Sequence, residues 1–370
     1  MNPIITNLVD EENIFKFTIK DINVSLANAL RRIILSEIPT VVFRTSPHDK
    51  NDATITVNTS RFNNEIIKQR LSCIPIKITD PEFPLSEHII EVDVTNDTQN
   101  IIYVTSKDFK IKNINTGKYL NDTVRDEIFQ PDKITGDYID FVRLRPKLSD
   151  NIPGEQLNLT CKFSRGTAKE NGAFNITSTC SYGATLDNAL ISKTWTEREK
   201  QVKAANNAIT REEIAILKQD WLLLDAKRLV IANSFDFIIE SVGVYSNFKI
   251  CELGCNVLIE RLKTVALNFQ EDKNIISKSK ATIENCYDIL LENEDFTIGK
   301  ILEYVIFENN FNKEVTFCGF KKPHPHVLHS ILRLAFKEDV DNTQIVAYLL
   351  SACETNIQIF ERLKANFIQE

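Results

Sequence analysis

VSLANALRRIIL, at residues 24–35 of this 370-residue chain, is the stretch that decides the fold. Its apolar side chains follow one another at steps of three, one, three and one residues, which places them on one face of an α-helix. FTIGKILEYVIF, at residues 296–307, repeats the same spacing at an offset of 272 residues without a gap. Ser25 and Thr297 occupy the same place in the two runs, just before the apolar residues, where an N-cap is expected. The chain therefore contains an internal repeat.

A second pair of runs supports this repeat and reveals an insertion. LIERLK at residues 258–263 resembles IFERLK at residues 359–364, and each run belongs to a long amphipathic pattern. In the first copy 232 residues separate the two matching runs, whereas in the second copy 61 residues do. The first copy thus holds about 171 additional residues, which is enough for an inserted domain.

These spacings predict an α+β fold built from two related units, which form a fused pseudo-dimer within one chain. The first unit is interrupted by a mainly β insert domain. The predicted boundaries are residues 1–45 and 186–270 for the first unit, 46–185 for the insert, 271–282 for a linker and 283–370 for the second unit.

Apolar side chains of the repeated helices are expected to pack against one another across the pseudo-two-fold axis. Two long helices, one at the end of each unit, would pair there. The predicted interface residues are Leu26, Leu30, Ile33, Leu258, Leu262, Ile298, Leu302, Val305, Phe360 and Leu363.

The pattern inside the insert is that of strands. Residues 53–57 and 157–163 alternate between apolar and polar side chains, and residues 64–71 form a short helical pattern. We therefore predict a β domain that carries one short helix near its start.

Residues 186–230 differ from both surrounding regions because they are charged and helix-prone. We interpret them as a solvent-exposed helical excursion. Trp195 and Trp221 are candidates for anchoring it to the β domain or to a partner.

Charge and composition exclude several functional classes. The chain carries 44 Lys and Arg against 51 Asp and Glu, a net charge of -7, which argues against nucleic-acid binding through the overall field. It has 10 glycines and neither of the common phosphate-binding loops. We expect no signal peptide and no membrane span, because no long uncharged apolar run is present.

The cysteines and histidines offer two weak candidates for a metal site. Cys251 and Cys255 lie four residues apart on one helical face, where they are either half a metal site or small apolar packing residues. His324, His326 and His329 lie within six residues, and they form either a set of metal ligands or a turn that enters a strand. We favour the packing and turn interpretations and expect no cofactor.

Several runs resemble the α-like subunits of multisubunit RNA polymerases, and they occur in the family's order over nearly the whole chain. The last third resembles the small eukaryotic eleventh subunit and archaeal subunit L. The runs are LANALRRIILSEIPT (26–40), NTS (58–60), EIIKQRLSCIPI (65–76), CKFSRGTAKE (161–170), FIIESVG (237–243), EDFTIGKIL (294–302) and FCGFKKPHP (317–325). A fusion of both parts in one chain resembles the polymerase subunit of large cytoplasmic DNA viruses of the mimivirus type.

The sequence also departs from the family pattern. Relatives often have EDHTLGN where this chain has EDFTIGK at residues 294–300. Some relatives carry a zinc loop or an iron–sulfur cluster in the insert, but here Cys73, Cys161 and Cys180 are widely separated. We therefore predict no bound metal.

The resemblance implies a subunit without catalysis of its own, which docks other subunits of a DNA-directed RNA polymerase for viral transcription. The implied partners are the largest and second-largest subunits and a small zinc-binding assembly subunit. Arg31 and Arg32 lie off the apolar helical face and are expected to be free for a partner. The candidate docking residues are Asn28, Arg31, Arg32, Glu65, Gln69 and Arg70, and the family-motif residues are Asp295, Thr297, Gly299, Gly319, Pro323, His324 and Pro325.

The resemblance further implies a location in the host cytoplasm, in viral factories, and in the virion if the source is viral, and otherwise inside a cell. The isolated chain is expected to be a monomer, because its dimerisation partner is already fused to it. Two alternatives are a metal-dependent enzyme centred on His324, His326 and His329, and a nucleic-acid-binding scaffold. Metal content and salt-dependent DNA binding distinguish them from an assembly subunit.

Overall fold

The computed structural model describes the chain except for residues 12, 150–151, 206–207, 272–274 and 369–370. The chain divides into two compact units. The first, here called the dimerisation unit, comprises Met1–Ile33, Thr179–Glu240 and Cys251–Glu370. The second, here called the insert unit, comprises Ile34–Ser178 and Ser241–Ile250. None of the helices in the described part of the chain is long and apolar enough to cross a membrane.

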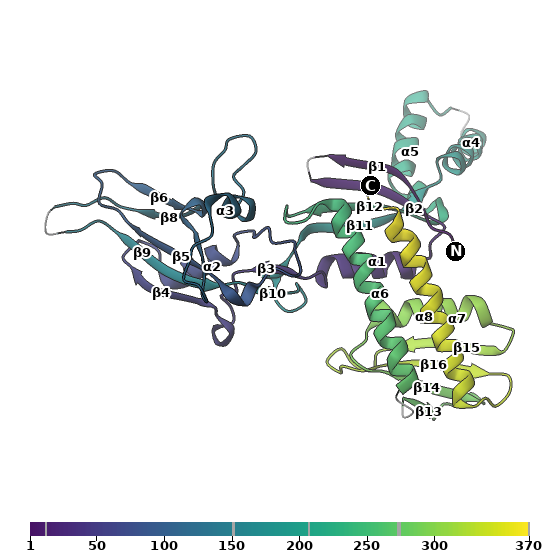
Figure 1. Ribbon diagram of the computed structural model, residues 1–370. Coiled ribbons are helices and arrows are strands. Elements are labelled where there is room, and N and C mark those ends of the chain that lie inside the picture. The colour runs from purple at the N-terminus through teal and green to yellow at the C-terminus, as the bar shows by residue number, and fades with distance from the viewer. Residues whose placement is uncertain (12, 150–151, 206–207, 272–274, 369–370) are drawn as a thin grey trace. The chain divides into compact units, whose positions relative to one another are not determined.

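The first sheet of the dimerisation unit has the strand order β1-β2-β12-β11. A hairpin forms β1 and β2, and β12 pairs antiparallel with β2. Helix α1 follows the hairpin and helix α6 follows β12 (Figure 1). The bounds are β1 Ile4–Glu11, β2 Ile14–Lys20, α1 Val24–Ser36, β11 Thr177–Leu186, β12 Val230–Ser241 and α6 Asn247–Glu271.

The second sheet repeats this topology, with the strand order β13-β14-β16-β15. A hairpin again precedes a helix, two strands and a long final helix, and the two central strands again pair antiparallel. The bounds are β13 Ile276–Lys278, β14 Cys286–Leu291, α7 Phe296–Asn310, β15 Val315–Lys321, β16 Ser330–Phe336 and α8 Asn342–Ala365. The internal repeat and the α+β fold predicted from the sequence are thereby confirmed.

The repeated helices begin two residues earlier than the sequence pattern suggested. Asp295 caps α7, because its Oδ1 accepts a hydrogen bond of 2.8 Å from the backbone N–H of Thr297. At the equivalent place before α1, Oδ1 of Asn23 accepts one of 2.9 Å from the N–H of Ser25. Ser25 and Thr297 are therefore first-turn residues rather than caps, since a carboxylate or amide two residues upstream already satisfies their N–H groups.

The insert unit contains an antiparallel sheet of order β4-β9-β5-β7, with the small sheets β6-β8 and β10-β3 beside it. Its core is rich in phenylalanine; Phe109 lies 5.4 Å from both Phe129 and Phe141 between ring centroids. The predicted strands and short helix correspond to β4, β9 and α2. The bounds are β3 Thr40–Val42, β4 Ala53–Asn58, α2 Asn64–Ser72, β5 His88–Thr95, β6 Ile102–Thr105, β7 Lys110–Asn113, α3 Asp122–Ile128, β8 Asp140–Leu144, β9 Gln156–Lys162 and β10 Ser164–Gly166.

Short 3₁₀ helices complete both units. They are η1 His48–Lys50, η2 Leu85–Glu87, η3 Ser106–Asp108, η4 Gly172–Phe174 and η5 Asp225–Arg228. Of these, η4 forms one wall of a groove in the insert unit.

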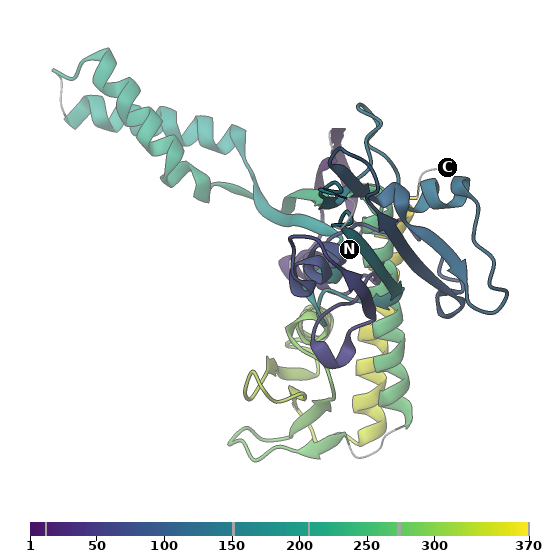
Figure 2. The ribbon, with the colours of Figure 1, turned by 90° about the vertical axis from the view of Figure 1, so that its left-hand side faces the viewer.

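The charged segment between β11 and β12 is helical, as its sequence predicted, and its two helices form a hairpin. Helix α4 spans Asn188–Ala205 and α5 spans Arg211–Leu223, and Figure 2 shows them as two adjoining teal helices. Trp195 and Trp221 lie 5.5 Å apart between ring centroids and form a small core with Ile191 and Ala226. The two tryptophans therefore hold the hairpin together. At the same point of the second repeat, between β15 and β16, the chain has only a short loop.

Three strands pair in a different part of the fold from the one that the predicted boundaries assign them to. β11 pairs in the dimerisation sheet although most of it was assigned to the insert, and β3 pairs with β10 in the insert unit although it was assigned to the first unit. β13 lies inside the predicted linker 271–282 and pairs with β14 of the second unit; residues 272–274 of that linker lie outside the described residues. We propose to draw the boundaries of the insert near residues 34 and 178, with the second unit starting at β13.

Candidate functional site

The predicted pseudo-dimer interface lies in the interior of the dimerisation unit. Its ten residues come from α1, α6, α7 and α8, and none is more than 5% exposed. Each helix contributes the apolar face that its sequence period defines. The buried residues are Leu26, Leu30, Ile33, Leu258, Leu262, Ile298, Leu302, Val305, Phe360 and Leu363.

Arg32 connects the two repeats. Its Nη2 lies 2.7 Å from Oδ2 of Asp295, and its Nε donates a hydrogen bond of 2.9 Å to Oγ1 of Thr297. The last turns of α1 are thus bound to the first turn of α7. The prediction that Arg32 is free for a partner is wrong, because its guanidinium is already bound by a carboxylate and a hydroxyl of the second repeat.

The pseudo-two-fold relation appears again at the equivalent position of α7. Tyr304 stands where α1 has Arg32, and its hydroxyl lies 4.0 Å from Sδ of Met1, just before the first repeat. Burial raises the pKa of Tyr304, and the nearby carboxylates of Glu308 and Asp21 raise it further. The two helices therefore lie antiparallel, each with its second half beside the start of the other.

A second pair of related contacts was missed by the sequence interpretation. Arg261 of α6 forms an ion pair with Glu294, the residue before the cap of α7. Arg362, at the matching position of α8, donates a hydrogen bond of 3.0 Å to the carbonyl oxygen of Met1. The only signal in the sequence was the shared Arg of the LIERLK and IFERLK runs, which gives no partner.

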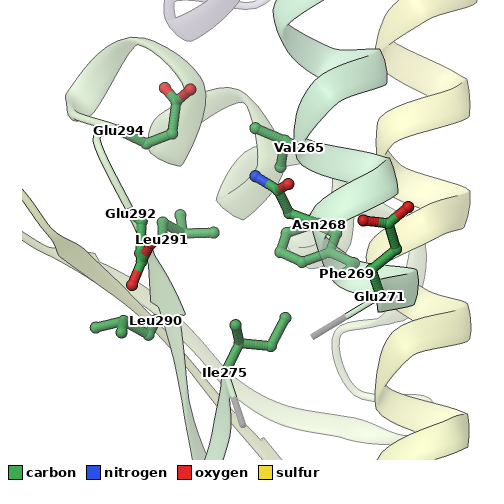
Figure 3. A pocket seen from close by; sticks show the side chains of 9 residues that line it. All are labelled: Val265, Asn268, Phe269, Glu271, Ile275, Leu290, Leu291, Glu292 and Glu294. Atoms are coloured by element: carbon green, nitrogen blue, oxygen red, sulfur yellow. The ribbon is translucent and has the colours of Figure 1, made fainter. Parts of the chain in front are cut away.

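The long helices α6 and α8 lie side by side in both ribbon views (Figures 1 and 2). Figure 3 shows Val265 and Phe269 of α6 beside Leu290 and Leu291 of the second sheet, around a cavity of about 150 Å³. Helix α6, from the first repeat, thus packs against the sheet of the second.

Helix α8 contacts both sheets. Near its start Tyr348 packs against Phe336 of the second sheet at 5.6 Å, and just beyond its end Phe367 contacts Phe17 of the first sheet at 5.4 Å between ring centroids. Because α6 and the segment at the end of α8 each contact the sheet of the other repeat, neither repeat buries its apolar surface alone.

Arg31 has a different environment from its neighbour Arg32. Its Nε donates a hydrogen bond of 3.0 Å to Oδ1 of Asn28, one turn earlier on the same helix, and both side chains are half-buried. In the described part of the chain this is the bond that its guanidinium makes, so most of its donors remain available. Arg31 and Asn28 therefore form a small, half-buried polar site on α1.

The second predicted docking group lies on α2 in the insert unit. Glu65 and Gln69 are exposed and one turn apart. Arg70 is held within its own unit: Nε donates 2.7 Å to the carbonyl oxygen of Phe141, Nη2 donates 2.8 Å to that of Asp140, and the guanidinium lies over the ring of Phe62. Arg70 therefore fixes α2 to β8 and leaves Glu65 and Gln69 as the exposed pair.

The glycines of the motif allow close packing. A Cβ at Gly299 would lie 2.0 Å from the ring of Phe320, and one at Gly319 would lie 2.8 Å from the ring of Phe317. The aromatic side chains of β15 thus rest directly on the helix and strand backbones. Pro323, His324 and Pro325 lie in the exposed loop between β15 and β16.

The histidines of that loop do not form a ligand set. The rings of His324 and His326 lie 5.0 Å apart, and Nδ1 of His324 accepts a hydrogen bond from the backbone N–H of His326. His329 is half-buried. Among the described residues there is no group of three or more His, Cys, Asp or Glu side chains that could hold a metal ion.

The cysteines of α6 are packing residues. Cys251 and Cys255 are fully buried, and burial raises the pKa of Cys255 to about 12 and that of Cys251 well above its usual range. Metal binding requires the thiolate, which these surroundings disfavour. Cys251 and Cys255 therefore act as small apolar packing residues.

Comparison with known proteins agrees with the two repeats. The family model of the RNA polymerase Rpb3/Rpb11 dimerisation domain matches residues 16–262, and a second model of the same description matches residues 286–366. The first match covers more than half of the chain and extends across the insert. The second covers the uninterrupted repeat.

Individual relatives match parts of the chain. Subunit 3B of RNA polymerases IV and V from Arabidopsis thaliana is 44% identical over 61 residues, which is 16% of this chain and 17% of that protein. Subunit rpac1 of RNA polymerases I and III from Dictyostelium discoideum is 28% identical over 188 residues, 47% of this chain and 50% of that protein. An uncharacterised protein, R713, of Acanthamoeba polyphaga mimivirus is 28% identical over 122 residues, 33% of this chain and 11% of that protein.

These three relatives are thus matched over half of their own length or less. The family is shown by the two domain matches, their order, and the repeated strand–helix topology on which they fall. The chain belongs to the RNA polymerase Rpb3/Rpb11 dimerisation domain family, and it carries two such domains in one polypeptide.

Proposed function

We propose that this chain is the assembly platform of a multisubunit DNA-directed RNA polymerase and has no catalysis of its own. The observation that carries the proposal is the pair of dimerisation domains, joined through the contact of Arg32 with Asp295 and Thr297. A fused pseudo-dimer presents one preassembled surface, so capture of a large partner does not first require association of two chains.

The partners in this proposal are the largest and second-largest polymerase subunits and a small zinc-binding assembly subunit. The proposed docking sites are Arg31 with Asn28 on α1, and Glu65 with Gln69 on α2. Arginine suits such a site because its planar guanidinium offers several donors to carboxylate or carbonyl oxygens. Arg32 and Arg70 support these sites from within the chain.

We further propose that the polymerase is viral and acts in the cytoplasm of the host cell and in the virion. Supporting this are the fusion of two domains in one chain and the similarity to a mimivirus protein. Fractionation of infected cells and mass spectrometry of purified virions would test the location.

The central test is affinity purification of the tagged chain from its natural source, followed by mass spectrometry. We expect two very large polymerase subunits to co-purify. Arg31→Glu should lower recovery of the second-largest subunit at least about tenfold, because it places a carboxylate where a donor is needed.

Lys200→Glu is the matched control, since it reverses an exposed charge on α4, a helix that carries none of the proposed docking residues. If both variants recover the large subunits as well as the unmodified chain does, Arg31 is not a docking residue. If the unmodified chain recovers none, the assembly function itself is refuted.

A further inference from the structure

An uncharged groove of about 470 Å³ crosses one face of the insert unit. Its walls are β3, the end of α2 with the segment that follows it, the η4 turn, and residues 242–244. In a chain of which 26% is charged, none of the described residues that line the groove carries a charge. The groove therefore suits neither a phosphate backbone nor a charged protein surface.

The lining combines an apolar floor with an amide rim. Val41 and Ile76 are buried in the floor, while Val242 on the lip is 47% exposed. Gln69 and Asn175 are exposed at the rim, and an amide side chain can both donate to and accept from a peptide group. An extended peptide fits this lining. Its backbone forms hydrogen bonds with the amide side chains of the rim, and its alternate side chains reach the apolar floor.

The groove is held open by contacts within the insert unit. Oη of Tyr245 donates a hydrogen bond of 3.1 Å to the carbonyl oxygen of Pro39, and the N–H of Val242 donates 3.0 Å to that of Ile176. Burial raises the pKa of Tyr245, so its hydroxyl stays protonated and can donate. Segments far apart in the sequence are thereby joined before any partner arrives, which limits the ordering entropy lost on binding.

We propose that this groove receives an extended, uncharged segment of another RNA polymerase subunit. The proposal rests on the assembly function proposed above and adds the chemistry of one contact. Uncharged lining and the exposed Val242 favour an apolar occupant. Gln69 places the groove next to the docking face of α2.

Gly172 offers a direct way to fill the groove. A Cβ at this position meets nothing within 4 Å, and its backbone is not left-handed, so a large side chain is tolerated there without strain. Gly172→Trp should reduce recovery of the large subunits at least about tenfold, because the indole occupies the space of the incoming segment. The free variant should keep the melting temperature of the unmodified chain.

Gly183→Trp is the matched control. Its Cβ position is equally open, but Gly183 lies on β11 and does not line the groove. Recovery of the large subunits should be unchanged. Equal recovery with both tryptophan variants would overturn the groove proposal while the assembly function stands. Failure of the unmodified chain to recover any large subunit would overturn both.

A second measurement identifies the occupant. With p-benzoylphenylalanine in place of Val242, irradiation of the assembled complex should cross-link the lip to one peptide of a large subunit. An uncharged stretch of that subunit is the expected product. A cross-link to a highly charged segment or to nucleic acid, or the absence of any cross-linked peptide, would refute the proposal.

Cys73 provides an independent readout, because it is exposed and lines the groove. Maleimide should label Cys73 in the free chain and at least about tenfold more slowly in the complex. The variant Gly183→Cys supplies an exposed reference thiol on the dimerisation sheet. Unchanged labelling of Cys73 in the complex would contradict an occupied groove.

Discussion

Arg31 and Arg32 are adjacent on α1 but have different hydrogen-bond partners. Arg31 and Arg32 both lie off the apolar face, so the sequence assigns them the same role. In the structure Arg32 is bound to Asp295 and Thr297, whereas Arg31 bonds to Asn28 on its own helix. The difference arises because the antiparallel crossing brings the start of α7 to one side of α1.

Arg32→Ala should destabilise the chain, and Arg31→Ala should change its stability little. The first substitution removes an ion pair and a hydrogen bond between the repeats, which we expect to cost about 1–2 kcal/mol because the pair is only partly buried. The second removes a bond within one helix, with an effect of roughly 0.5 kcal/mol or less. Urea denaturation of both variants measures the difference, and equal midpoints would contradict a connecting role for Arg32.

The capping carboxylate Asp295 should make stability depend on pH in the acid range. Burial alone raises its pKa, but hydrogen bonds from Thr297 and the charges of Arg32 and Arg261 outweigh it, so the pKa lies below the ordinary 3.8. A lowered pKa means that the ionised form stabilises the fold above about pH 4, and that this contribution is lost as pH falls through the folded-state pKa.

Asp295→Asn should therefore destabilise the protein at pH 7 and differ progressively less from the unmodified chain below pH 4. Thermal melting across this range provides the measurement. A stability difference that is the same at pH 7 and pH 3 would show that Asp295 acts only as an uncharged cap. Asp341→Asn, at the capping box of α8, is the matched control.

At the scale of elements, the two repeats share one topology but differ in their connections. Between the third and fourth strands the second repeat has a short loop, whereas the first has the hairpin α4–α5. The hairpin has its own small core around Trp195 and Trp221, and its base is closed by the backbone bond from Asp187 to Leu229. These features make it an addition to the sheet rather than a part of it.

Replacing residues 188–228 by a short Gly-Ser turn should leave the first sheet intact. β11 and β12 remain neighbours in that sheet, and the second repeat shows that this connection can be short. We expect hydrogen exchange of β2 and β12 to be unchanged in the shortened chain. Loss of protection in these strands would mean that the hairpin supports the sheet.

At the scale of the whole molecule, the dimerisation unit is stabilised by elements of one repeat that pack against the sheet of the other. Helix α6 packs against the second sheet, Tyr348 of α8 contacts the second sheet, and Phe367, just beyond α8, contacts the first. The apolar surfaces that a separate dimerisation domain would offer to a partner are thus buried within one chain.

The isolated chain should accordingly be a monomer of 42.3 kDa in light scattering. In the described part of the chain the apolar faces of its dimerisation helices are already buried, so they are not available to a second copy. After cleavage at a protease site inserted behind Glu271, the two fragments should still co-elute, because the buried contacts do not depend on the connection. A stable dimer of the intact chain, or separation of the cleaved fragments, would contradict this.

The sequence alone determined the periodic features of this protein. The steps of three and one residues in α1 and α7 revealed the repeat, the unequal spacing revealed the insertion, and the motif runs indicated the family. These features are local or one-dimensional, since helix period, copy number and insertion length are visible in the order of residues.

Only the tertiary structure decided which polar residues on the helices have partners elsewhere in the chain. Arg32, Arg261 and Arg70 bind groups far away in the sequence, and the uncharged groove joins segments from four separate regions. The strand membership of β3, β11 and β13 was likewise decided by pairing partners. Such contacts depend on the crossing of helices and the register of sheets, which sequence spacing does not specify.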